Sequence, residues 1–232
     1  MKARALLGLF VAVAVLAPAA NAAPPRVQQL VVFRDGEAVQ KPTGTRAARV
    51  TASGRRCTVG TATALAALVR SRVGRLRVRD FGACSSRPRD ASALIVTGIR
   101  DDRNRGQRGW VYKVGRRAAT AGAADTSGPF GNGRLRRGQR ITWFYCLRAG
   151  DCQRTLAVRA TAVSGGIVAT VRGYDDGGDG VLVEGATVSA SGVSGVTGAD
   201  GRVQLALPPG THRVVARKDG LVRSYTERVE VP

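Results

Sequence analysis

The sequence predicts a mainly β protein with one helix, in which an α+β domain is followed by a small β-sandwich. One segment, residues 63–72, places apolar side chains at the spacing of an α-helix face. The other apolar stretches are short, alternate apolar with polar residues and end at Gly, Asp or Pro turns, as strands do. The pattern changes at residues 164–166, a glycine-rich stretch that we expect to be a linker. The two domains would then span residues 23–163 and 167–232.

The chain begins with the organisation of a secretory leader. A basic start at Lys2 and Arg4 precedes an apolar core that is shorter than the roughly 20 residues of a membrane span. Residues 20–22 are Ala-Asn-Ala, a small-residue signal for cleavage before Ala23. We therefore expect residues 1–22 to be a signal peptide and the mature chain, without a membrane span, to be secreted or associated with the cell envelope. A retained anchor is the alternative, which the alanine-rich end disfavours.

Most of the first domain shows strand signals. Trp110, Tyr112 and Val114 alternate with other residues, as a strand with one buried face would. Residues 118–133 are rich in Gly, Ala and Ser, and we expect them to be irregular. The expected strands lie at residues 27–33, 48–52, 93–99, 110–114 and 141–145.

The expected helix at residues 63–72 has its own end signals. Thr61 or Thr63 can cap its first turn with a side-chain oxygen. Arg70 and Arg72 fall in the last turn, where positive charge complements the helix dipole. One helix packed against several short strands predicts an α+β arrangement.

Residues 167–232 carry strand and turn signals. Asp200-Gly201 can form a tight hairpin turn, and Pro208-Pro209-Gly210 favours a second reversal. His212 is expected to face solvent on one of the strands. The expected strands lie at residues 168–172, 187–190, 203–207, 212–217 and 225–231. Their spacing predicts a small all-β sandwich.

Four cysteines in an exported chain predict two disulfides. Cys146 and Cys152 flank a short Gly-containing loop that can join two strand ends. Cys57 and Cys84 then close a longer loop, which stabilises the fold by about 3 kcal/mol. A zinc site is the weaker alternative, because the chain has no C-x-x-C pair and one histidine.

The formal charge of +21 is unevenly distributed. Residues 166–232 contain seven Lys/Arg and eight Asp/Glu, so the first half of the mature chain carries the positive charge. A basic surface attracts acidic polymers through long-range electrostatics. Arginine-favouring codon bias is an open alternative, because only four of the 37 basic residues are lysine.

The first domain resembles a known family through four motifs. They are Thr63-Ala64-Leu65-x-Ala67-Leu68, Gly109-Trp110-x-Tyr112-x-Val114, Gly122-Ala123-Ala124-Asp125 and Leu135-x-x-Gly138-x-x-Ile141-x-Trp143-x-Tyr145. In this order they are similar to the DUF4430 domains, the transcobalamin-C-terminal-like modules, over residues 26–160. The resemblance implies a β-grasp-like fold. Because the related domain of transcobalamins helps to enclose a corrinoid, it also implies an alternative function, an extracellular carrier of a corrinoid-like ligand near Trp110 and Trp143.

A second resemblance covers residues 167–231. Its motifs are Gly185-Ala186-x-Val188, Thr197-Gly198-x-Asp200-Gly201, Leu205-x-Leu207-Pro208-x-Gly210-Thr211, Val214-Val215-Ala216 and Lys218-x-Gly220. This order resembles the carboxypeptidase regulatory-like domain, a prealbumin-like or Ig-like sandwich appended to exported proteins. That domain is a non-catalytic attachment, so the resemblance implies no peptidase activity.

Catalytic and metal-binding patterns are weak in this chain. Residues 175–180, Asp-Asp-Gly-Gly-Asp-Gly, offer oxygen ligands for calcium but lack the full EF-hand spacing, and a solvated turn is the favoured interpretation. No G-x-S-x-G or phosphate-binding loop occurs. We expect no catalytic residue, metal or cofactor, and a hydrolase using Asp/Glu pairs is the least favoured function.

The function that we expect is non-enzymatic binding. The basic first domain would contact an acidic cell-envelope polymer or glycan, not nucleic acid, and the sandwich would act as a spacer or docking module. The aromatic strands would present a platform for sugar rings, although filling a small core is the favoured role for such residues. The expected ligand contacts are Trp110, Tyr112, Arg116, Arg117, Arg134, Arg136, Arg137, Arg140 and Trp143.

Overall fold

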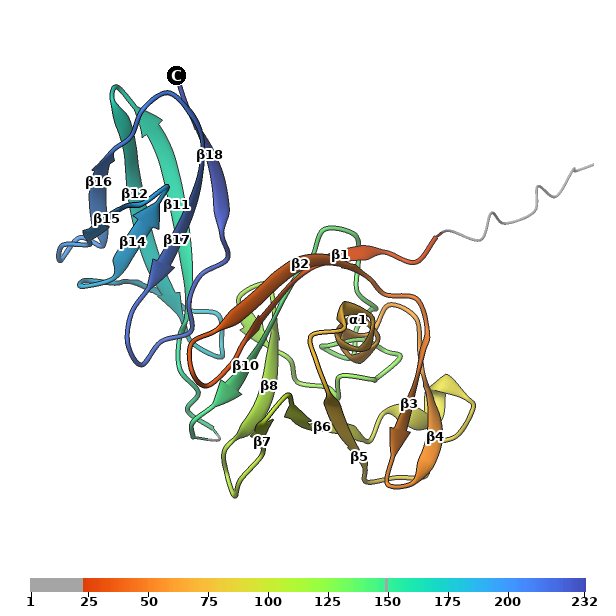
Figure 1. The fold of residues 1–232 in the computed structure, drawn as a ribbon. Coiled ribbons are helices and arrows are strands. Elements are labelled where there is room, and N and C mark those ends of the chain that lie inside the picture. The colour runs from red at the N-terminus through yellow and green to blue at the C-terminus, as the bar shows by residue number, and fades with distance from the viewer. Residues whose placement is uncertain (1–22, 149) are drawn as a thin grey trace, which may run out of the picture.

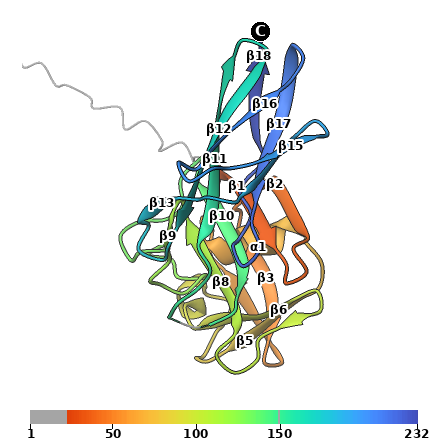
Figure 2. The ribbon, with the colours of Figure 1, turned by 90° about the vertical axis from the view of Figure 1, so that its left-hand side faces the viewer.

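The computed structural model describes residues 23–148 and 150–232. Strands dominate these residues and one α-helix is present, which confirms the mainly β class. The chain forms two lobes (Figure 1), of which the first lobe comprises residues 23–148 and the second lobe residues 155–232. A quarter turn shows the same separation (Figure 2). The expected leader lies outside the described residues, and none of their helices is long and apolar enough to span a membrane.

The first lobe is built on a five-stranded sheet in the order β2-β1-β10-β8-β9. β1 and β10 run parallel, and the other neighbours are antiparallel. The strands are β1 (Arg26–Val32), β2 (Ala38–Gly44), β8 (Gly109–Val114), β9 (Arg117–Ala118) and β10 (Arg140–Cys146). The strands expected at 27–33, 110–114 and 141–145 are thereby confirmed. Of residues 118–133, which were expected to be irregular, Ala118 ends β9 and residues 119–133 are irregular.

A second sheet in the first lobe has the order β4-β3-β5-β6-β7. Its strands are β3 (Ala48–Ala52), β4 (Arg55–Val59), β5 (Leu76–Asp80), β6 (Leu94–Ile99) and β7 (Asp102–Arg103), with a 3₁₀ helix η1 (Pro88–Ala91) before β6. The strands expected at 48–52 and 93–99 are confirmed. The arginine-rich strands β4 and β5 were not expected, because their exposed positions obscure the apolar alternation.

The expected helix is present as α1 (Ala64–Ser71), which contacts β1, β2 and β3. The Thr63 hydroxyl accepts a hydrogen bond from the Ala66 N–H at 3.2 Å, so Thr63 is the N-cap. Arg72 ends the helix in the left-handed conformation. Leu65 and Leu68 are fully buried on the face that packs against the sheets.

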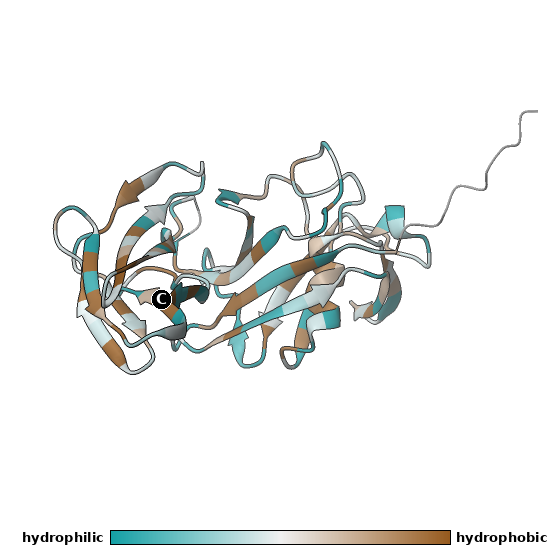
Figure 3. Cartoon of the chain, turned by 90° about the horizontal axis from the view of Figure 1, so that it is seen from above, coloured by the Kyte–Doolittle hydropathy of each residue, from teal (hydrophilic) through white to brown (hydrophobic). Residues whose placement is uncertain are grey.

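The second lobe consists of two sheets that share one apolar core. One sheet has the order β11-β12-β13, with β16 also paired to β12, and the other has the order β15-β14-β17-β18. Along their strands apolar and polar residues alternate (Figure 3), and Ile167, Val188 and Val214 meet in the core. The strands are β11 (Thr155–Val163), β12 (Gly166–Tyr174), β13 (Gly180–Leu182), β14 (Thr187–Ala190), β15 (Val193–Val196), β16 (Arg202–Ala206), β17 (Gly210–Arg217) and β18 (Glu227–Val231).

The expected linker at residues 164–166 needs correction. These residues close a hairpin, because β11 and β12 pair over their full length on either side of Ser164-Gly165. Leu156 and Val158 of β11 belong to the core of the second lobe. The boundary suggested by composition therefore lies inside the second lobe, and the glycines serve a tight reversal in which Gly165 has φ of 73°.

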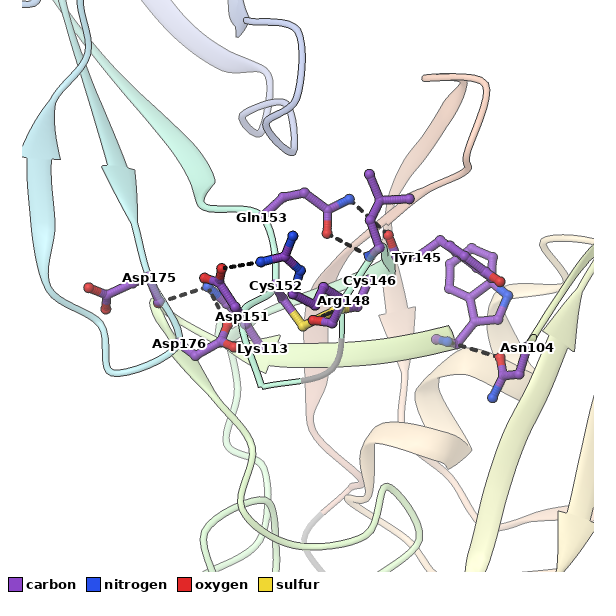
Figure 4. The surroundings of a disulfide bond; sticks show 12 residues. Asn104, Lys113, Tyr145, Cys146, Arg148, Asp151, Cys152, Gln153, Asp175 and Asp176 are labelled. Carbon is purple, nitrogen blue, oxygen red and sulfur yellow. Dashed lines mark hydrogen bonds and ion pairs between the residues drawn. A yellow bond between two sulfur atoms is a disulfide. The ribbon is translucent and has the colours of Figure 1, made fainter. Parts of the chain in front are cut away.

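Both expected disulfides are present, Cys57–Cys84 and Cys146–Cys152. The first ties the segment before η1 to β4. The second joins the end of β10 to the segment that enters β11, at the passage between the lobes (Figure 4). Beside it, the Gln153 amide donates to the Tyr145 carbonyl oxygen and accepts from the Leu147 N–H, each at 3.0 Å.

Apolar contact and hydrogen bonds join the two lobes. Leu30 and Phe144 of the first lobe form one buried cluster with Val222 and Tyr225 of the second lobe. The Tyr225 hydroxyl lies 2.7 Å from the Ile141 carbonyl oxygen, to which it donates. Burial raises the pKa of Tyr225 above its ordinary value. The lobes are therefore packed against each other and not merely tethered.

A buried lysine provides a second connection between the lobes (Figure 4). The Lys113 ammonium of β8 donates to the carbonyl oxygens of Tyr174 at 3.0 Å and Asp175 at 2.7 Å. It also pairs with the Asp176 carboxylate at 3.1 Å. Burial lowers the pKa of Lys113, and the paired Asp176 carboxylate partly opposes that shift.

Candidate functional site

The three aromatic candidates lie in the core of the first lobe. Trp143 is 1% exposed and stacks on Tyr112 with ring centroids 4.9 Å apart, while Trp110 meets Tyr145 edge to face. The Trp110 indole donates to the Asp102 carbonyl oxygen, and the Tyr112 hydroxyl donates to that of Ala121, both at 2.9 Å. Burial raises the pKa of the Tyr112 hydroxyl. These rings fill the core, which is the role that the sequence favoured, and they do not form an exposed platform for sugar rings.

A hollow of about 250 Å³ borders the same three aromatic residues. Pockets for drug-sized ligands span about 300–1,000 Å³. This hollow is smaller than that range, and a corrinoid is larger than a typical drug, so the geometry offers no support for the carrier alternative.

The arginine candidates are spread over several places. Arg117 lies over the Phe130 ring, and Arg134 donates to the Thr126 carbonyl oxygen at 3.0 Å. Arg136 and Arg137 are exposed in the turn before β10. The structure therefore does not gather the six arginines on one surface.

Arg116 and Arg140 alone among these candidates line one hollow, which we call the arginine groove. It has a volume of about 730 Å³ and is formed where the first lobe meets the β11-β12 sheet. Its lining residues are Arg116, Arg140, Ala157, Val158, Arg159, Thr161, Thr170, Arg172, Tyr174, Gly178, Asp179, Gly180 and Arg202. Five arginines and one carboxylate give this surface a strong positive charge.

Strand register sets the arrangement of arginines in the groove. On β12, Thr170 pairs with Arg159 of β11 on one side and with Arg202 of β16 on the other. Neighbouring strands are about 4.8 Å apart, so the two arginines arise from positions about 10 Å apart across the sheet. Arg172 follows on the same face of β12, because alternate residues share a face.

The arginines of the groove differ in whether their guanidinium groups already contact another side chain. Arg140 forms an ion pair with the Glu227 carboxylate, including a bond of 2.9 Å from Nη2 to Oε2, and this bond raises the pKa of Arg140. Arg116 lies over the Tyr174 ring at 4.4 Å. Within the described part of the chain, Arg159, Arg172 and Arg202 form no ion pair. Arg172 also donates one hydrogen bond to the Gly180 carbonyl oxygen at 3.3 Å. The remaining donors of these three guanidinium groups can bind an anionic ligand.

Sequence reasoning did not name Arg159, Arg172 or Arg202, because it placed the ligand contacts between Trp110 and Trp143. The apolar alternation of the sequence could have shown that two of them, Arg159 and Arg172, face away from the core. Leu156, Val158 and Ala160 alternate toward the core, so Arg159 must face away, and the same argument places Arg172 opposite Val171.

In the aspartate loop at residues 175–180, the Asp175 carboxylate bonds to groups of the protein itself. Asp175 accepts hydrogen bonds from the backbone N–H groups of Gly178 at 3.0 Å and Asp179 at 2.9 Å, and it pairs with Arg154 at 3.3 Å. These bonds, led by that from the Asp179 N–H, lower the pKa of Asp175. No metal-binding group of His, Cys, Asp and Glu occurs in the described residues. The loop acts as a turn that docks on Lys113.

His212 is buried, which corrects its expected solvent-facing position. Its Nε2 lies 2.8 Å from the Pro208 carbonyl oxygen, which can only accept, so Nε2 carries the proton. Its Nδ1 lies 2.9 Å from the Ser191 hydroxyl. The histidine thus links the β14–β15 turn to the start of β17, a structural role.

Comparisons of the chain with protein-family models, curated proteins and solved structures find no match. The two family resemblances therefore stay predictions.

Proposed function

We propose that this protein is a non-enzymatic, exported binding protein that holds an acidic cell-envelope polysaccharide in the arginine groove. The observation that carries this proposal is a set of three guanidinium groups on one sheet face, those of Arg159, Arg172 and Arg202, which form no ion pair with any described residue. Guanidinium groups bind carboxylates through paired hydrogen bonds. A polymer with repeated carboxylates would engage several of them at once.

The distribution of aromatic residues favours a polysaccharide over single-stranded nucleic acid. Proteins that bind single strands stack bases on exposed aromatic rings. Among the aromatic residues that the structure describes, Phe81 is strongly exposed, at 59%, and it does not line the groove. Tyr174, the aromatic residue in the groove, is buried beneath Arg116.

We include in this proposal the two specific folds expected from the sequence, a β-grasp-like first lobe and a regulatory-like sandwich. The helix packed on a mixed sheet supports a β-grasp-like first lobe, and two sheets around one core support a regulatory-like sandwich in the second. Two disulfides are compatible with a location outside the cytoplasm. The second lobe would be more than a spacer, because it supplies Arg159, Arg172 and Arg202.

Binding of polygalacturonate, a polymer of uronic acid, tests the proposal. We expect the mature chain to bind it with an affinity that falls steeply with added salt, because bound arginines release counterions. R159Q/R202Q should weaken binding about tenfold, or about 1.4 kcal/mol, and lower the salt slope by about 2. R213Q/R228Q is the matched control, since it removes two exposed arginines from the other sheet of the same lobe.

Three results would contradict the proposal. One is equal loss of binding in the two double variants, which would indicate a nonspecific charge effect. Another is salt-insensitive binding. The third is tighter binding of single-stranded DNA than of polygalacturonate at matched salt, which would favour the other class of polymer.

A further inference from the structure

A second basic surface lies in the first lobe, within a stretch of unusual composition. Residues 38–79 contain ten Lys/Arg and no Asp/Glu. This stretch folds into β2, β3, β4, α1 and β5. Surface charges of one sign destabilise a compact fold through self-repulsion. A stretch of this kind therefore favours a binding partner that supplies negative charge.

The stretch forms a hollow of about 680 Å³, which we call the β3–β4 hollow. Its lining residues are Ala47, Ala48, Arg49, Arg56, Cys57, Thr58, Arg70 and Ser86, with no carboxylate among them. Register places Arg49 opposite Thr58 and Arg56 opposite Thr51. Since alternate residues share a face, Arg49 and Arg56 project from the same side of the hairpin.

Two features hold the hollow in shape. The Arg70 guanidinium of α1 donates to the carbonyl oxygens of Arg46 and Ala47, which immediately precede β3. The Cys57–Cys84 disulfide and a 2.9 Å hydrogen bond from the Thr58 N–H to the Ser85 carbonyl oxygen fix the segment that carries Ser86. The hollow is thus built by a helix, a hairpin and a cross-linked loop.

The arginines of the hollow lack acidic partners. Within the described residues, Arg49, Arg56 and Arg70 form no ion pair. The nearby Asp90 accepts a hydrogen bond from the Ser85 hydroxyl at 2.6 Å and pairs with Arg89, and it does not line the hollow. The charge of the hollow therefore matches an acidic ligand, as that of the arginine groove does.

The two basic surfaces lie on different lobes. β3 and β4 are at the end of the first lobe away from the second lobe (Figure 1), whereas the groove uses β11, β12 and β16. The contacts of Lys113 and Tyr225 hold the lobes together. One polymer strand in each surface would consequently be kept at a fixed separation.

We propose that the β3–β4 hollow is a second binding site for acidic polysaccharide, so that one molecule of this protein cross-links two polymer strands. This inference rests on the proposed function, because it assigns the same ligand to a second surface. Its distinctive consequence is bivalency, which binding through one site does not produce.

Stoichiometry and cross-linking test the inference with the mature chain. Titration with short oligogalacturonate should find two sites for the unchanged protein. At ligand concentrations near the affinity of the unchanged protein, it should find one site for R49Q/R56Q and one for R159Q/R202Q, because the altered site of each variant binds about tenfold more weakly. It should find two sites for the control R213Q/R228Q. With long polygalacturonate, light scattering by the unchanged protein should rise at intermediate ratios of protein to polymer, because each molecule then joins two strands. The scattering should fall again when protein is in excess. For R49Q/R56Q and for R159Q/R202Q it should stay low at every ratio. Circular dichroism establishes that each variant is folded.

The outcomes separate the two proposals. If R49Q/R56Q keeps two sites and full scattering, the second site is refuted while the groove stands. If R159Q/R202Q keeps two sites and R49Q/R56Q keeps one, the groove assignment fails while the hollow is supported. A single site in the unchanged protein that R159Q/R202Q removes also refutes the second site. No binding by the unchanged protein refutes both proposals.

Discussion

The Nζ atom of Lys113 in the first lobe lies 2.7 Å from the carbonyl oxygen of Asp175 in the second lobe. Its side chain is 1% exposed, yet it carries a charge that must be compensated. Two carbonyl oxygens and the Asp176 carboxylate provide that compensation. The aspartate loop is therefore a docking element, and the arginine groove depends on it, because the same loop contributes Gly178 and Asp179 to the groove.

Lys113→Met should destabilise the protein. The variant leaves the Tyr174 and Asp175 carbonyl oxygens without their donor at the junction, and we expect a loss of about 2 kcal/mol in the free energy of unfolding. Asp176→Asn should cost less, because Asp176 is 36% exposed and both carbonyl bonds remain. Urea denaturation measures both values. Equal stability of Lys113→Met and the unchanged protein would disprove the role of this residue.

The two disulfides should contribute unequally to stability. Cys57 and Cys84 are 27 residues apart, whereas Cys146 and Cys152 are 6 apart. Loop-closure entropy predicts losses of about 3.6 and about 2.4 kcal/mol when each pair is replaced by alanine. Thermal unfolding of the two double variants checks this order, and a larger loss for the shorter loop would contradict it.

Alkaline pH should weaken the fold through its buried tyrosines. Burial raises the pKa of Tyr112 in the folded state, so its contribution is fully present below the unfolded pKa of about 10 and is lost as pH rises through the folded value. Tyr112→Phe should be less stable by about 1 kcal/mol at neutral pH, since it loses the bond to Ala121.

Denaturation midpoints of Tyr112→Phe and of the unchanged protein, measured from neutral to alkaline pH, give the contribution of Tyr112 to the pH dependence of stability. Other groups, including Lys113 with its lowered pKa, titrate in both proteins and cancel in the difference. The gap between the two proteins should narrow above pH of about 10. A constant gap would show that Tyr112 does not contribute to the pH dependence.

Lysine should not replace arginine in the groove without loss. R159K/R202K keeps both charges but loses the planar guanidinium that bonds a carboxylate twice. We expect affinity for polygalacturonate to fall severalfold while the salt slope stays near that of the unchanged protein. Fluorescence anisotropy with labelled polymer measures both quantities. Full affinity would show that the groove acts through charge alone.

Local signals of the sequence predicted most elements correctly. The helix follows from the apolar spacing of residues 63–72 and the cap at Thr63, and both disulfides follow from the cysteine spacing. The glycine-rich turn at residues 164–166 gave the wrong boundary, because a hairpin turn and a linker share the same composition. The aromatic strands were correctly located, and the burial of Trp110, Tyr112 and Trp143 agrees with the core-filling role that the sequence favoured.

The sequence alone determined the class of fold, the strand periodicity and the excess of positive charge, since each depends on neighbouring residues. Tertiary structure decided which of these positive charges lie together and which are neutralised by an ion pair. Arg159 and Arg202 are far apart in the chain and meet because β11 and β16 both pair with β12. Arg140, a neighbour in the same groove, is paired with Glu227 through the packing of the lobes. Strand pairing and ion pairing over long sequence separations depend on the whole fold, and no local pattern encodes them.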